Sequence, residues 1–142
     1  MDIIPILALV SALAALGLAF FYFGAVKKEA PGNERMVELM DAISEGAKAF
    51  LKQEYTWVAG FVAVMAILVG VFVAPLGALT YILGAVLSAG AGYVGMTVAT
   101  MANARTAEAA RTGGPGKALP LAFRGGAVMG FSVAGLALLG LS

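Results

Sequence analysis

The sequence predicts an all-α fold: a multi-span transmembrane helical bundle with four membrane-spanning helices, in which a long amphipathic cytoplasmic helix enters the second span. The composition favours a membrane protein. Of the 142 residues, 61% are apolar and 12% are charged, with a mean hydropathy of +0.96, whereas soluble domains carry about 25% charged residues. Charged residues are also absent from three long runs, as expected of segments that cross a hydrocarbon core of about 30 Å.

The first uncharged run extends over 24 residues, from Ile3 to Val26, and a transmembrane helix needs about 20. Lys27 and Lys28 follow this run, whereas a cleavable signal peptide carries its positive charge before a shorter apolar core. The run therefore predicts a membrane anchor that is retained in the mature protein.

The second uncharged run covers 50 residues, from 55 to 104, and Pro75 interrupts it near the middle. Because proline ends a helix, this run predicts two spans joined by a turn. The last run covers 18 residues, from 125 to 142, and predicts a fourth span whose helix starts near Leu119. We expect one polytopic membrane domain over residues 1–142, with spans at about 3–26, 55–74, 77–104 and 119–141 and cytoplasmic segments at about 27–54 and 105–118.

The basic residues predict an orientation in the membrane. Eight of the nine lie in the two connecting segments, and Arg124 near the start of the fourth span lies on the same side. The opposite side holds Asp2 and the uncharged turn at Pro75. The positive-inside rule then places both segments in the cytoplasm and the N-terminus outside, with a bacterial plasma membrane as the expected location. The eight residues are Lys27, Lys28, Arg35, Lys48, Lys52, Arg105, Arg111 and Lys117.

The first connecting segment predicts a charged helix. Asn33 is a good N-cap, Glu34 is in the first turn, and Lys48 and Lys52 near the end suit the helix dipole. Without a break before Gly60, this helix is expected to continue into the second span. An interfacial helix lying on lipid is the alternative. Apolar residues recur at helical spacing along one side, namely Met36, Met40, Ile43, Ala47, Phe50 and Leu51.

Small residues recur at four-residue steps in the third and fourth spans. Such stripes favour close helix packing, with a glycine-lined pore as the alternative. We expect the stripe Gly84, Ser88 and Gly92 and the pair Gly126 and Gly130 to face protein, so that leucine there destabilises the fold while Val98→Leu is nearly neutral. A second stripe consists of Ala91, Gly95 and Ala99.

The residue types exclude many kinds of chemistry. The chain has no cysteine and no histidine, which excludes disulfides and thiolate or imidazole sites, and a net charge of +1 argues against nucleic-acid binding. No acidic residue lies within a predicted span, so a proton-carrying rotor or a self-sufficient small multidrug antiporter is not expected. Residues 113–117 resemble a phosphate-binding loop, but Arg111 and Ala118 depart from its pattern, which predicts a helix stop and linker.

Two further charged features have structural interpretations. Arg105, Glu108 and Arg111 are spaced by three residues, which predicts that the third span continues as a charged helix held by ion pairs. Arg124 is expected to extend toward the headgroups, with pairing to a carboxylate elsewhere as the alternative.

Several strings, in order and with matching spacing, resemble the membrane-integral ion-pumping inorganic pyrophosphatases, which are pyrophosphate-energised proton or sodium pumps. The resemblance covers nearly all of the chain. Members of this family are much longer homodimers, so the resemblance implies an N-terminal fragment. The matching strings are residues 43–51 with Glu54 and Tyr55, residues 83–89, Gly95 and Met96 with Ala99, residues 102–111, and residues 125–133.

The resemblance implies that the full-length protein couples pyrophosphate hydrolysis to proton or sodium translocation. It also implies Mg²⁺ held by clustered aspartates in later helices, with K⁺ as a candidate activator. No Asp follows Asp41 in this chain, so we assign no catalytic, cofactor-binding or metal residue here and expect a scaffold segment that is inactive alone. The alternative is a free-standing four-helix membrane scaffold or assembly protein without enzymatic activity.

Overall fold

The structure, a computed structural model, describes residues 3–142. They form three α-helices, α1 (Ile3–Lys28), α2 (Glu34–Phe72) and α3 (Pro75–Leu141), and no strand occurs in this range. The all-α prediction is therefore confirmed. Each helix is long and apolar enough to cross a membrane by length and composition. Asp2, which the sequence assigns to the side opposite the basic residues, lies outside the described range.

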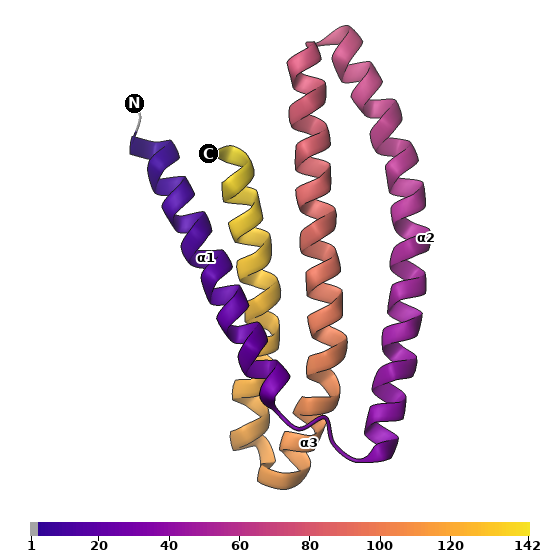
Figure 1. Ribbon diagram of the computed structural model, residues 1–142, viewed down its shortest axis with the longest axis vertical. Coiled ribbons are helices and arrows are strands. Elements are labelled where there is room, and N and C mark those ends of the chain that lie inside the picture. Colours follow the sequence, from indigo (N-terminus) through magenta and orange to yellow (C-terminus); the bar gives the residue numbers. More distant parts are fainter. Residues whose placement is uncertain (1–2) are drawn as a thin grey trace.

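Helix α3 reverses direction at one residue. Gly114 has φ 64° and ψ −166°, which is not helical, and the chain turns back there (Figure 1). We call residues 75–113 the first arm of α3 and residues 115–141 the second arm. The second arm starts directly after Gly114, at Pro115, which is earlier than the start near Leu119 expected from the sequence. Proline suits this position because its fixed φ fits a first helical turn.

The core lies where α1 meets the two arms of α3 (Figure 1). One buried cluster joins Ala19, Val98 and Val128, and a second joins Val26, Ala102 and Leu121. On α1 the buried residues Ala12, Ala19 and Val26 recur every seven positions, which is the spacing of helices that cross at a shallow left-handed angle. Tyr22 of α1 stacks on Phe131 of the second arm with 6.1 Å between ring centroids.

Of the two small-residue stripes in the first arm, the structure packs the second, which begins with Ala91 and Gly95. Ala91 and Gly95 are buried in the first arm, and Val98 at the next step is fully buried. Within the described residues Gly84, Ser88, Gly126 and Gly130 are exposed, so no neighbour in residues 3–142 packs closely on them. The expectation that Val98→Leu is neutral does not fit the structure, because Val98 is fully buried and a larger side chain at a filled position has no room.

The exposed stripe borders a groove instead. Gly84, Ser88 and Gly92 line an open hollow of about 690 Å³ between the arms, opposite Val133 and Ala137 of the second arm. The second stripe was expected to comprise Ala91, Gly95 and Ala99, but Ala99 is exposed. After Gly95, the next buried residue of the first arm is therefore Val98.

Helix α2 is continuous from Glu34 to Phe72 and packs on α3. The expected N-cap is confirmed, since the Asn33 side chain accepts a hydrogen bond of 3.0 Å from the Met36 backbone N–H. The Tyr55 hydroxyl donates a hydrogen bond of 2.6 Å to the Ala89 carbonyl of the first arm. Because hydrogen bonds are stronger in a low-dielectric environment, this bond fixes the position of α2 along the axis of the first arm.

Only some of the apolar residues on one side of α2 are buried. Leu51 is buried, while Ile43 is 52% exposed and Phe50 is 56% exposed. The buried and half-buried residues of α2 therefore follow a narrower line than the sequence pattern indicates. The half-buried members of this line are Met36, Met40 and Ala47.

Candidate functional site

No metal-binding cluster occurs in residues 3–142: no three acidic, histidine or cysteine side chains there are grouped so that they could hold an ion. Asp41 and Glu45 are both exposed on α2. A Mg²⁺ site needs carboxylates around one pocket, and the described residues do not provide such a site. The candidate binding groups of the described residues are the basic side chains near the Gly114 turn.

Arg105 joins three segments at this end of the molecule. Its Nε donates a hydrogen bond of 3.1 Å to the carbonyl of Glu29, just after α1, and its Nη1 donates one of 3.1 Å to the Met101 carbonyl. The same Nη1 lies 3.5 Å from the Met40 sulfur on α2. The guanidinium fork can serve several acceptors at once, so Arg105 connects the α1–α2 linker to α3.

Of the two ion pairs expected at three-residue steps, Arg105 with Glu108 and Glu108 with Arg111, only the second forms. Glu108 pairs with Arg111 through two hydrogen bonds of 2.8 Å, whereas Arg105 donates to backbone carbonyls instead. The hydrogen bonds from Arg111 lower the pKa of Glu108, and Glu108 raises the pKa of Arg111. A carboxylate whose pKa falls on folding stabilises the folded state above its unfolded pKa, and that contribution is lost as the pH drops.

A pocket beside the Gly114 turn, which we call the basic-end pocket, has a volume of about 210 Å³. Its charged lining residues are Glu29, which directly follows α1, and Lys117 and Arg124 from the second arm. Neither Lys117 nor Arg124 forms an ion pair with another described residue. Arg124 therefore lines the same pocket as Glu29 without pairing to it. The apolar lining consists of Ala109, Gly116, Pro120 and Leu121.

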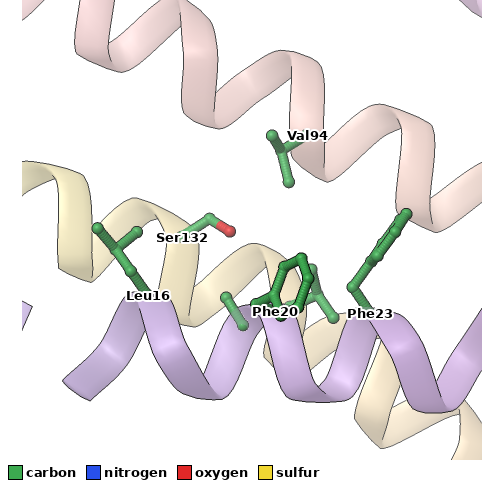
Figure 2. Close-up of a pocket in the computed structure, with 7 residues that line it drawn as sticks. Leu16, Phe20, Phe23, Val94 and Ser132 are labelled. Atoms are coloured by element: carbon green, nitrogen blue, oxygen red, sulfur yellow. The ribbon is translucent and has the colours of Figure 1, made fainter. Parts of the chain in front are cut away.

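A second pocket, between α1 and the arms of α3, has a different character. Its volume is about 300 Å³, and Leu16, Phe20 and Phe23 of α1 line it together with Val94 of the first arm (Figure 2). Ser132 of the second arm supplies the only oxygen among its lining side chains. With no charged group in its wall, this pocket suits a hydrocarbon chain better than an ion or a phosphate.

We expect Arg105→Met to lower the free energy of unfolding by about 1 to 2 kcal/mol, because hydrogen bonds from a charged donor to two carbonyls are lost. The matched control is Arg35→Met. Arg35 pairs with Glu38 at an exposed position, where such a pair contributes about 0.3–0.5 kcal/mol. Thermal unfolding of the full-length protein in detergent compares them, and equal losses of stability would contradict a joining role for Arg105.

The fold and this site define a polytopic, all-helical membrane protein whose described part carries a packed helical core and a basic end but no metal-binding cluster. A family model described as inorganic H⁺ pyrophosphatase matches residues 13–142. The chain belongs to this family, as its resemblance implied. The match does not favour a free-standing scaffold protein.

Three relatives illustrate the similarity. The chain is 48% identical over 130 residues to a K⁺-stimulated pyrophosphate-energized sodium pump of Thermotoga maritima, covering 91% of the chain and 18% of the relative. It is 46% identical over 133 residues to a K⁺-insensitive pyrophosphate-energized proton pump of Methanosarcina mazei, covering 92% and 20%.

A K⁺-insensitive pyrophosphate-energized proton pump of Moorella thermoacetica is 41% identical over 143 residues, covering all of the chain and 21% of the relative. The chain thus spans about a fifth of the length of the relatives that it matches. Its similarity extends to pumps of both ions, so similarity in this region does not separate proton from sodium pumps.

Proposed function

We propose that this chain is the N-terminal part of a pump that couples hydrolysis of inorganic pyrophosphate to proton or sodium translocation. The observation that carries the proposal is the match to pyrophosphate-energized pumps over nine-tenths or more of the chain. The 142 residues act as scaffold, because α1 and the two arms of α3 form a packed core while their outward surface is apolar. Binding and hydrolysis belong to the remainder of the polypeptide.

The metal ligands are part of this proposal. Magnesium would neutralise charge on pyrophosphate and position the attacking water. Because residues 3–142 contain no group of carboxylates that could hold this ion, we place its ligands outside this range. K⁺ is a candidate activator, since the relatives include both K⁺-stimulated and K⁺-insensitive pumps. A homodimer in a bacterial plasma membrane is the assembly that we propose.

We further propose four membrane crossings within one polytopic domain. The reversal at Gly114 supports this, because the arms of α3 run side by side: a side chain at Gly95 would contact Met129 of the other arm. The crossings are α1, the later half of α2, and the two arms, with the N-terminus outside. The first half of α2 is then an amphipathic cytoplasmic helix continuous with the second crossing.

Cysteine labelling tests the topology, since the chain has no native cysteine. We expect a membrane-impermeant maleimide to label Leu76→Cys from outside and Thr112→Cys from the cytoplasm. Leu76 is 70% exposed beside the α2–α3 turn, and Thr112 is exposed beside the Gly114 turn. Labelling of both positions from the same side would contradict a crossing by the first arm, and a reversed pattern would contradict the orientation.

Phosphate release tests the function. The full-length protein that contains this sequence should hydrolyse magnesium pyrophosphate in vesicles and build an ion gradient, whereas the 142-residue chain should match empty vesicles because it lacks a carboxylate cluster. A full-length protein without hydrolysis would refute the proposal. Turnover by the short chain that is lost on Asp41→Asn or Glu45→Gln would instead reveal a site in the scaffold.

A further inference from the structure

The basic-end pocket differs from the other hollows in its charge. Lys117 and Arg124 are seven residues apart, so they lie on one side of the second arm about two helical turns apart. Glu29, directly after α1, also lines the pocket. Two basic residues and one acidic residue therefore line a space of about 210 Å³. This excess of one positive charge suits a group with a single negative charge.

The surroundings of the pocket are apolar and outward-facing. Phe123, next to Arg124 in the chain, is 76% exposed, and Leu119 is 58% exposed. In the proposed membrane arrangement, this end of the second arm lies at the level of the lipid headgroups. A basic side chain at that depth places its charge near the lipid phosphates while its stem stays against hydrocarbon. Pockets of this kind between helices are suited to lipid headgroups.

We propose that the basic-end pocket binds the phosphate of an anionic phospholipid, with Arg124 and Lys117 as its ligands. The guanidinium of Arg124 can bind two phosphate oxygens at once, and the ammonium of Lys117 adds a point charge. The acyl chains then extend along Leu119 and Phe123. This proposal rests on the membrane placement described above and is independent of pyrophosphate hydrolysis.

Glu29 favours a lipid over a soluble phosphate. A phosphodiester headgroup carries one negative charge, whereas inorganic phosphate near pH 7 is a mixture of singly and doubly charged anions. Glu29, as an acidic residue of the pocket lining, disfavours the additional negative charge. Lipid phosphate and inorganic phosphate share the same recognition chemistry, and competition between them separates the two sources.

A reporter beside the pocket tests the proposal in the full-length protein. A fluorophore is attached at Phe123→Cys in a background without other cysteines, and the protein is placed in vesicles of phosphatidylcholine and phosphatidylglycerol. Either lipid carries bromine, which quenches the fluorophore on contact. We expect brominated phosphatidylglycerol to quench in preference to brominated phosphatidylcholine, and a reporter at Phe61→Cys, exposed on α2, to show no preference.

Charge removal gives the decisive comparison. The double variant Lys117→Gln with Arg124→Gln should abolish the preference, because each basic residue removed lowers the affinity for an anionic lipid about fivefold. Lys48→Gln with Lys52→Gln removes the same charge from exposed positions on α2 and should leave the preference intact. Equal quenching by both lipids in the unaltered protein, or equal loss in both double variants, would overturn the proposal. Unchanged thermal unfolding confirms that the variants are folded.

Two further readouts separate the alternatives. Added inorganic phosphate should not displace phosphatidylglycerol, and displacement would assign the pocket to a soluble anion and overturn the lipid assignment. Phosphate release is measured on the same vesicles. Absence of hydrolysis together with a retained lipid preference would count against the proposed function while leaving this inference supported.

Discussion

Gly125→Leu is expected to destabilise the protein by about 3 kcal/mol, while Gly126→Leu at the next position is nearly neutral. A Cβ at Gly125 would lie 2.8 Å from the Cβ of Ala102, and Gly126 has no such neighbour within 4 Å. Because Ala102 is buried and has no rotatable side chain, the arms must separate to admit any substituent. Overpacking of this kind costs about 1–3 kcal/mol, sometimes more.

Thermal unfolding of the full-length protein in detergent measures the difference between these variants. Gly125→Ala should cause a smaller loss of stability than Gly125→Leu, because even one methyl group contacts Ala102. Gly126→Ala should be neutral or slightly stabilising, since alanine is the better helix former. If Gly126→Leu lost as much stability as Gly125→Leu, the contact face of the second arm would be assigned wrongly.

Gly114→Val is expected to cost about 2 to 3 kcal/mol and to disturb the reversal of α3. With φ 64° and ψ −166°, Gly114 occupies a region of backbone conformation that is almost restricted to glycine, and other residues there cost about 1–3 kcal/mol. Valine adds the stiffness of a β-branched side chain. Without this turn the second arm cannot pack on α1 and the first arm.

The control is Gly116→Val, two residues further along the chain. Gly116 has helical backbone geometry, and a Cβ there would meet no neighbouring atom within 4 Å. Size-exclusion chromatography and thermal unfolding compare the two variants as assembled protein. A normal profile for Gly114→Val would show that the reversal does not depend on glycine at this position.

The sequence was sufficient for the helices. Long uncharged runs predicted the membrane-spanning helices, and Asn33 specified the start of α2 through its side chain. Pro75 specified the start of α3, where its missing N–H leaves no hydrogen bond unmade. The absence of any acidic residue between Tyr55 and Ala104 likewise excluded an ion-coupling carboxylate there. These features depend on local residue types, so no tertiary information was needed.

The sequence could not identify the partners of the basic end. Arg105 and Glu108 have the spacing of an ion pair, yet Arg105 donates to the Glu29 carbonyl, 76 residues away. A carbonyl is present at every residue and therefore leaves no pattern. The meeting of Glu29 with Lys117 and Arg124 in one pocket likewise requires the path of the chain between α1 and the second arm.

The sequence by itself determined the membrane class, the helical content and the family of this protein, because charge-free runs and local motifs are read one segment at a time. Only the tertiary structure decided which face of each helix is buried. Two small-residue stripes lie on the first arm of α3, and helical periodicity permits either to pack. The turn at Gly114 sets how the second arm returns, and it buries Gly95 and Val98 while leaving Gly84 exposed.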